Sequence, residues 1–421
     1  EILEEIVLLS TQKSIEAARN KPDAKELCKL EFSDGEIDML IYNKKNNTCQ
    51  LYEIKHSKEQ DPLQYRHLID KEKNKKIEEH YGKIVGRYVL YRGENKTLKN
   101  GIEYIILDEG WSPGESADLL KVIPGLDLDE IIRFGKEKNV GIILWAGFYP
   151  FQKNIEGVCK HYSEKGVKGF KVDFMDSDDQ QIPEFLEESA SIAAKYHLML
   201  DFHGIYKPTG LSRMYPNVVN YEGIYGLEQM KWGANPDQVD YDVTVPFIRL
   251  FAGSADYTQG AMRNASYDNV RAVSSEGMSP GTRCRQLAEY VVFFSPLNML
   301  CDSPSNYIGE LECTGFIAGV PTVWDETIAL QGKVGEYVAV ARRAGSQWYV
   351  GSLTDWNERD LTLDLSFLDE GDYDMVVFRD GVNADKAARD YKKITMPVPA
   401  DRQLKVHMAP GGGYVARIIK K

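Results

Sequence analysis

The feature of this sequence that most constrains its fold is a repeated alternation of strand-like and helix-like segments between residues 96 and 316. Apolar runs of strand length alternate with helical patterns such as Ile155–Lys165. Repeated β-then-α units favour a parallel sheet, and we predict an α/β domain of the (β/α)8-barrel type over residues 96–316. The strand-like runs are Ile102–Leu107, Val140–Trp145, Gly169–Phe174 and His197–Phe202.

The segments on either side of this region differ from it in composition. Residues 1–95 are rich in Lys and Glu and contain a polar, helix-like stretch at Asp61–His80. Residues 317–421 hold short strand candidates separated by Gly, Asp and Asn, a pattern typical of an all-β sandwich. These candidates are Gln347–Leu353, Leu361–Phe367 and Tyr373–Arg379. We therefore predict three domains, 1–95, 96–316 and 317–421.

Composition narrows the classes of function. The chain has 421 residues, 43% of them hydrophobic and 27% charged, and a net charge of −13 that lies almost entirely after residue 94. An acidic second part disfavours nucleic acid as a partner and suits a neutral sugar together with a cation. No apolar run approaches the ~20 residues that a membrane-spanning helix needs. The acidic start Glu1–Ser10 is unlike a signal peptide, so we expect either a cytoplasmic chain or a missing N-terminal segment.

Acidic residues lie at the ends of the predicted barrel strands, where barrels of this class carry out their chemistry. One buried strand ends in Asp173, and Lys171, two residues earlier, points to the same face of that strand. The lysine would favour the ionised carboxylate that a nucleophile requires. Glycoside hydrolysis needs two carboxyl groups flanking the scissile bond, so Asp173 is a candidate for one of them. A strand-end aspartate that only caps a loop is the alternative.

Two glutamates, Glu222 and Glu228, follow in a stretch flanked by Arg213 and Trp232. One of them could hold a hard cation while the other protonates a leaving group, and ligation by oxygen alone suits Ca²⁺. Two solvated glutamates without a shared role are the alternative. The candidate substrate-binding residues, mostly at strand ends, are Asp108, Glu109, Trp111, Trp145, Lys171, His203 and Arg213.

From about residue 100 to the C-terminus, the sequence resembles family 97 of the glycoside hydrolases. The resemblance rests on eight motifs in order: 104–111 (YIILDEGW), 166–176 (GVKGFKVDFMD), 207–213 (KPTGLSR), 215–223 (YPNVVNYEG), 226–232 (GLEQMKW), 256–262 (DYTQGAM), 302–305 (DSPS) and 320–326 (VPTVWDE). It implies a calcium-dependent α-glycosidase that acts on oligosaccharides, with a barrel and a C-terminal β-sandwich. It also suggests a periplasmic or secreted location.

The resemblance further implies roles for single residues. Inverting members of the family carry a glutamate base directly after a strand-end histidine, whereas His203 is followed here by Gly204. The nucleophile of retaining members corresponds to Asp173. The resemblance therefore implies a retaining enzyme for α-galactosides, with Glu228 as general acid/base and both Glu222 and Glu228 as Ca²⁺ ligands. The aglycone, the linkage and the oligomeric state stay open.

Residues 1–95 do not resemble the large β-sandwich that begins proteins of that family. Asp38, Glu53, Lys55 and Gln64 instead resemble the PD-(D/E)XK nuclease-like fold, and more closely the C-terminal domain of some prokaryotic AAA-type ATPases. By that resemblance Asp38 and Glu53 would bind Mg²⁺ and Lys55 would orient a water molecule. A degenerate interaction module is the alternative for this segment.

The junction near Glu94–Asn100 has two explanations, a natural fusion or a gene model joined from two reading frames. The usual first barrel strand is not recognisable, so the barrel is expected to be incomplete unless Ile84–Tyr91 replaces that strand. Besides the α-galactosidase, two other functions therefore stay open: an inactive sugar-binding remnant and an ATPase-associated nuclease-like module.

Overall fold

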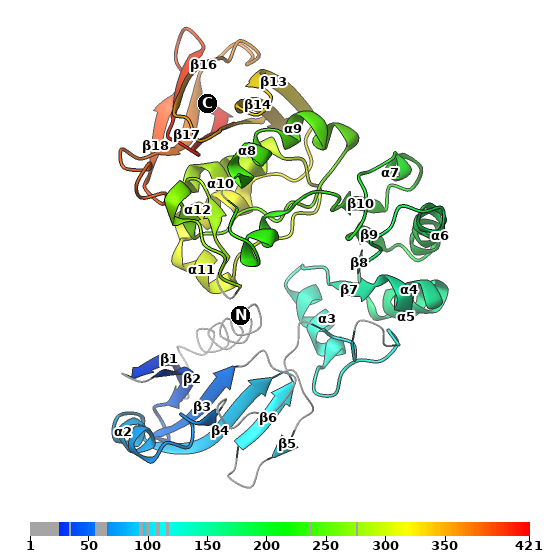
Figure 1. Ribbon diagram of the computed structural model, residues 1–421, viewed down its shortest axis with the longest axis vertical. Helices are drawn as coiled ribbons and strands as arrows, with labels where there is room; N and C mark the ends of the chain where they lie inside the picture. Colours follow the sequence, from blue (N-terminus) through cyan, green and yellow to red (C-terminus); the bar gives the residue numbers. More distant parts are fainter. Residues whose placement is uncertain are drawn as a thin grey trace. The chain divides into compact units, whose positions relative to one another are not determined.

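The computed structural model divides the chain into two compact units, Glu1–Ile142 with Ser303–Ser305, and Ile143–Asp302 with Asn306–Lys421 (Figure 1). The structure describes residues 25–32, 35–54, 65–91, 96–97, 102–106, 110–114, 118–235, 237–274 and 277–421. Within these ranges no helix combines the length and the apolar character that crossing a membrane requires.

The first unit contains a six-stranded sheet with the strand order β1-β2-β3-β4-β6-β5 (blue to cyan in Figure 1). Its strands are β1 Lys25–Phe32, β2 Gly35–Asn43, β3 Thr48–Ile54, β4 Lys83–Tyr91, β5 Lys96–Thr97 and β6 Ile102–Ile106. Helix α2, Lys71–Tyr81, connects the parallel strands β3 and β4 and begins where the Asp70 side chain accepts hydrogen bonds from two backbone amides. Its buried Ile77 joins the apolar core of this sheet.

The strand predicted at Ile102–Leu107 lies in this sheet as β6. It pairs in parallel with β4, so that Arg87 lies opposite Ile102 and Tyr91 opposite Ile106. Among the described residues its hydrogen-bonded neighbours are β4 and β5 alone. That this run also belongs to a barrel with the later strands stays a prediction. Its parallel partner is the run Ile84–Tyr91 that was considered as a replacement strand.

The nuclease-like residues are described only in part. The pairing of β2 with β3 ends at Met39 and Tyr52, and Asp38 and Glu53 are the residues next to this last pair. Both carboxylates are buried. Lys55 and Gln64 lie outside the described residues, and the nuclease-like character of this segment stays a prediction.

The second unit begins with four parallel strands in the order β7-β8-β9-β10. The strands are β7 Ile143–Gly147, β8 Gly169–Asp173, β9 Met199–Phe202 and β10 Val218–Tyr221. The helices α4 Phe148–Lys153, α5 Ile155–Lys165, α6 Gln181–Lys195 and α7 Leu211–Met214 connect them, whereas α3 Leu128–Glu137 belongs to the first unit. The predicted β-then-α alternation and the bounds of α5 are confirmed. Within the described part of the chain these strands form an open sheet, so the closed barrel stays a prediction.

The remainder of the second unit is helical at first and then all β. The helical elements are η2 Leu227–Lys231, α8 Gln238–Asp242, α9 Val245–Ile248, η3 Leu250–Ala252, η4 Tyr267–Asn269, α10 Arg283–Val292, α11 Pro304–Gly309 and α12 Leu311–Gly319, with β11 Asn264–Ala265 and β12 Ser279–Pro280 as a short pair. Every residue of α10 is buried. Gly351 permits the close approach of this helix to strand β15, Gln347–Thr354, because a Cβ atom there would lie 2.9 Å from the Cβ of Val291.

The C-terminal strands confirm the predicted β-sandwich character of this region (orange to red in Figure 1). Six antiparallel strands follow the order β13-β14-β15-β20-β17-β18, and β16 pairs with β19. The strands are β13 Glu326–Lys333, β14 Tyr337–Ala344, β15 Gln347–Thr354, β16 Arg359–Asp364, β17 Tyr373–Asp380, β18 Tyr391–Pro397, β19 Gln403–Met408 and β20 Gly413–Lys420. Inward-facing side chains of both sheets form one apolar core, which includes Val350, Leu363 and Val406.

Candidate active site

Asp173 is the last residue of β8, and its carboxylate is anchored at both oxygens. Oδ2 accepts a hydrogen bond from Trp145 Nε1 at 3.1 Å and lies 3.7 Å from Lys171 Nζ. Oδ1 accepts a hydrogen bond from the amide of Phe174 at 2.8 Å. The Asp173 side chain is 14% exposed, so it can still be reached. The carboxylate is thus held in one orientation at the carboxyl end of the parallel sheet, where α/β proteins bind their ligands.

Position 204, next to this carboxylate, has no room for a side chain. Gly204 has φ +56°, and a Cβ atom on it would lie 2.9 Å from the amide nitrogen of Phe174. The carbonyl of Gly204 also accepts a hydrogen bond from the Asp176 amide at 2.8 Å. A catalytic glutamate at this position would need both a left-handed backbone and space that the β8 loop occupies.

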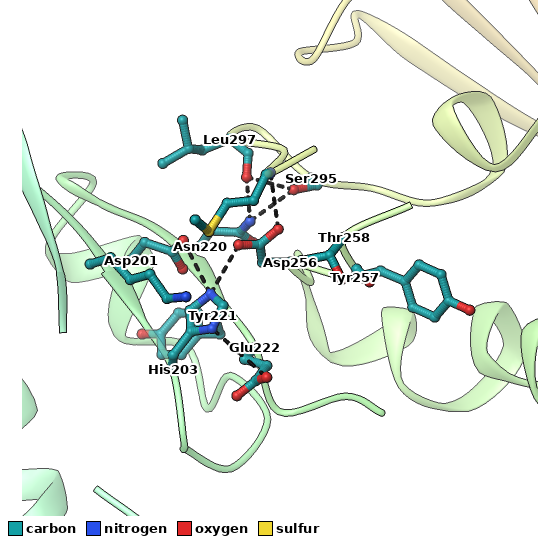
Figure 2. A network of polar contacts seen from close by, with 12 residues as sticks. Asp201, His203, Asn220, Tyr221, Glu222, Asp256, Tyr257, Thr258, Ser295 and Leu297 are labelled. Carbon is teal, nitrogen blue, oxygen red and sulfur yellow. Dashed lines mark hydrogen bonds and ion pairs between the residues drawn. The ribbon is translucent and has the colours of Figure 1, made fainter. Parts of the chain in front are cut away.

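His203 lies among the carboxylates of Asp201, Glu222 and Asp256, and its side chain is buried (Figure 2). Its side chain is 2% exposed, with Nε2 2.9 Å from Asp256 Oδ2 and 3.4 Å from Asp201 Oδ2. Burial alone would lower the pKa of His203, but the hydrogen bonds with Asp201 and Asp256 raise it to about 10. The imidazole is therefore a buried cation at neutral pH, suited to orienting its neighbours; direct contact with a sugar would need an exposed ring.

Glu222 connects this buried cation to the other carboxylates. Its Oε1 lies 3.8 Å from His203 Nδ1, and its Oε2 accepts a hydrogen bond from the Gly204 amide at 2.8 Å. Burial raises the pKa of Glu222; the charge of His203 and the Gly204 amide oppose this, and the charges of Glu228 and Asp173 raise it further. The charges of Glu228 and of Asp173 thus both act on Glu222.

Glu228 is carried by the short helix η2, in its first turn. The backbone of this turn is tied to the segment after Asp256. The Leu227 amide donates to the carbonyl of Tyr257 at 2.9 Å, and the Glu228 amide donates to Thr258 Oγ1 at 3.3 Å. The position of Glu228 therefore depends on a segment about thirty residues further along the chain.

Two groups in the site could be considered for a metal ion. Ligand atoms of Asp201, His203 and Asp256 lie within 4.8 Å of one another, and all three residues are buried. His203 Nε2 is hydrogen-bonded to Asp256 Oδ2 and lies 3.4 Å from Asp201 Oδ2, so the imidazole already faces two carboxylates in a buried network. Glu222 and Glu228 offer only carboxylate oxygens and carry like charges, and this donor set suits Ca²⁺.

The structure brings some of the other predicted residues to the site. Trp145 and Lys171 contact Asp173, whereas the side chain of Arg213 is exposed on α7. Trp111 is buried in the first unit. Asp108 and Glu109 lie outside the described residues.

The sequence predicted His203 as a substrate-binding residue and assigned no role to Asp201, Asp256 or Thr258, whereas the structure buries the His203 side chain. Asp201 and His203 are two positions apart at the end of β9, and this period-two spacing places both on one face of the strand. That spacing was a usable signal. Asp256 and Thr258 gave no such signal, because their contacts with His203 and Glu228 arise only from the tertiary fold.

Two regions of the sequence match known protein families. Residues 95–224 match the glycoside hydrolase 97 family, and residues 323–419 match the family described as glycosyl-hydrolase 97 C-terminal, oligomerisation. A retaining alpha-galactosidase of Bacteroides thetaiotaomicron is 59% identical over 320 residues, which are 76% of this chain and 48% of that protein. These matches show that the region after residue 95 is similar in sequence to glycoside hydrolases.

Two solved structures resemble the fold as well. A glycoside hydrolase family 97 enzyme from Pseudoalteromonas sp. strain K8, in complex with acarbose, has 25% identity and a TM-score of 0.67, covering 83% of this chain and 56% of that one. A beta-arabinopyranosidase has 26% identity and a TM-score of 0.59, covering 69% and 48%. The two family-97 matches cover residues 95–224 and 323–419, so much of the chain after residue 95 is similar to glycoside hydrolase family 97. The chain spans about half the length of the curated relative it matches.

Proposed function

We propose that this chain is a retaining α-galactosidase, with Asp173 as nucleophile and Glu228 as general acid/base. The observation that carries the proposal is the anchored carboxylate of Asp173 beside a position 204 that has no room for a side chain. An inverting enzyme needs a base that activates water, whereas a retaining enzyme needs a carboxylate that attacks the sugar. The name of the Bacteroides relative supports the choice of galactose.

The reaction has two displacement steps. An Asp173 oxygen attacks the anomeric carbon while Glu228 gives its proton to the glycosidic oxygen, so the aglycone leaves and a galactosyl ester forms on Asp173. Water then attacks the same carbon, Glu228 takes its proton, and the ester bond breaks. Each step inverts the anomeric carbon, and the sugar is released with its original configuration. Lys171 and Trp145 hold the carboxylate of Asp173 in place throughout.

The stereochemical outcome tests this function. Proton NMR during early hydrolysis of 4-nitrophenyl α-galactopyranoside should show α-galactose first, followed by slow mutarotation to the β-anomer. The β-anomer first would mean inversion and would contradict the roles of both Asp173 and Glu228. Absence of hydrolysis would favour the sugar-binding remnant.

A β-arabinopyranoside is the second candidate substrate, because one structural relative carries that activity in its name. β-L-Arabinopyranose has the ring configuration of α-D-galactopyranose without the C6 hydroxymethyl group. The ratio of kcat/KM for the two 4-nitrophenyl glycosides decides between them. Galactosidase function requires the ratio to favour the galactoside.

We also propose that Glu222, with Glu228 nearby, holds Ca²⁺, as an oxygen-only donor set suits this ion. The ion would supply positive charge at two carboxylates that otherwise repel each other and Asp173. Chelation with EGTA should lower kcat/KM by about tenfold or more, because even ~1.4 kcal/mol of lost stabilisation has that effect. Added Ca²⁺ should restore the rate, whereas Zn²⁺ should not. Full activity in protein shown to be metal-free by mass spectrometry would contradict the proposal.

A further inference from the structure

Thr258 has a backbone conformation that β-branched residues rarely adopt. Its φ is +61°, in the left-handed region where the Cβ atom crowds the following carbonyl. The residue is buried, so the conformation belongs to the packed interior of the unit and not to a loose surface loop. Strained backbone of this kind persists only where surrounding contacts hold it, and it is concentrated at functional sites.

The contacts that hold Thr258 lead directly to the candidate acid/base. Its hydroxyl donates a hydrogen bond to the carbonyl of Tyr257 at 2.6 Å and accepts one from the Glu228 amide at 3.3 Å. The same Tyr257 carbonyl accepts a hydrogen bond from the Leu227 amide at 2.9 Å. A Cβ atom on Gly226 would lie 3.1 Å from that carbonyl and 3.3 Å from Thr258 Oγ1. The first turn of η2 is therefore packed directly onto the Tyr257–Thr258 backbone.

The two residues before Thr258 fix this segment from other sides (Figure 2). Asp256 Oδ2 is hydrogen-bonded to the imidazole of His203 at 2.9 Å. His203 in turn lies beside Glu222, so Asp256 is linked to Glu222 through the histidine. Tyr257 is fully buried, and its hydroxyl hydrogen-bonds to the Asp242 carboxylate. Asp242 also lies 3.3 Å from the guanidinium of Arg285. A segment anchored at both preceding residues can hold the strained conformation of the third.

We propose that Thr258 is a positioning residue for Glu228, and that its strained conformation aims its hydroxyl at the backbone of the acid/base. Asp256 supports Glu222 through His203, and Thr258 supports Glu228. Residues 256–258 thus set the distance between the two glutamates, because one rigid segment supports both. The proposal rests on the proposed role of Glu228 and adds a residue that touches neither sugar nor water.

The kinetic test uses leaving groups of different quality. Thr258→Val keeps the shape and the β-branch but removes the hydroxyl, so Glu228 loses one backbone anchor. We expect kcat/KM to fall roughly 10- to 100-fold for an α-galactosyl disaccharide, whose departure needs a well-placed acid. For 2,4-dinitrophenyl α-galactoside the loss should be below about threefold, since this aglycone leaves without protonation. Thr258→Ser should behave like the wild type on both substrates.

A matched control comes from Thr244, whose hydroxyl donates to the carbonyl of Asp240, four residues earlier, at 2.8 Å. Thr244→Val should not change the ratio of the two rates. A merely structural role for Thr258 would lower both rates of Thr258→Val equally and leave their ratio at the wild-type value. That result on an active wild-type chain overturns the proposal.

Two measurements do not depend on activity. Hydrogen exchange followed by NMR should show loss of protection at the Glu228 amide in Thr258→Val, while the Leu227 amide stays protected. Thr258→Gly should melt at a higher temperature than Thr258→Val, although glycine costs more entropy on folding, because only glycine adopts this φ without strain. Unchanged exchange at Glu228, or a lower melting temperature for the glycine variant, contradicts the proposal. If the wild-type chain hydrolyses nothing, the proposed function fails and these two measurements alone decide the role of Thr258.

Discussion

Replacing Asp173 by glycine should lower kcat for aryl α-galactosides by roughly 10⁴- to 10⁶-fold, the range seen when a catalytic nucleophile is removed. The variant lacks the oxygen that attacks the anomeric carbon, and position 204 has no room for a substitute carboxylate. The fold should survive, because Asp173 is the terminal residue of β8 and its side chain is only partly buried. Initial rates and a melting curve on the same preparation separate these two effects.

Azide should restore part of the activity of Asp173→Gly, because a small anion can enter the space left by the carboxylate. It would attack from the side of Asp173, opposite to the leaving group, in a single displacement. The product should therefore be β-galactosyl azide, identified by its coupling constant in proton NMR. Asp178→Ala, which removes an exposed acid five positions further along the chain, is the matched control and should keep wild-type rates. An Asp173→Gly variant within tenfold of the wild type, or an α-azide product from it, would refute the nucleophile assignment.

Local patterns were sufficient to predict the strand that carries Asp173 and the helix before it. The helical spacing of Ile155–Lys165 matches α5 residue for residue, because apolar positions buried against the sheet recur at helical intervals. Lys171 and Asp173 share a face of β8 for the same kind of reason, since side chains alternate along a strand. These properties depend on neighbours within one element, and the sequence alone encodes them.

The pairing of strands was not predictable in this way. The sequence offered Ile84–Tyr91 only as one option for a strand beside the run Ile102–Leu107, and the structure pairs β4 with β6 in parallel. Parallel strands are brought together by long connections, so their choice of partner depends on competition between sheets and not on the apolar pattern of either strand.

The residues that hold His203 and Glu228 in place could not be identified from the sequence either. Nothing local to His203 says that Asp256, 53 positions away, will hold its ring and keep it charged. The left-handed backbone of Thr258 contradicts the conformational preference of a β-branched residue. A prediction from residue preference would therefore not place Thr258 in the left-handed region. Places where local preference and tertiary structure disagree are where functional sites are expected.

Replacing Glu228 by glutamine should affect substrates unequally. For a galactoside with a sugar as aglycone, kcat/KM should fall by roughly 10²- to 10⁴-fold, because the amide cannot protonate the departing oxygen. For 2,4-dinitrophenyl α-galactoside the first step should be nearly unaffected. The second step should then be slow, because no base remains to activate water, and the galactosyl ester on Asp173 should accumulate. Intact-protein mass spectrometry would detect this ester as an added galactosyl mass.

Azide distinguishes this variant from Asp173→Gly. In Glu228→Gln it would attack the ester on Asp173, which gives a second inversion and α-galactosyl azide, whereas loss of the nucleophile gives the β-azide. Glu187→Gln, an exposed change on α6, is the matched control and should show neither accumulation nor azide dependence. Because the charge of Glu228 helps to raise the pKa of Glu222, its removal should lower the pKa of Glu222. Equal losses on both substrates, with no trapped ester, would show that Glu228 is not the acid/base; the proton donor would then have to be sought elsewhere.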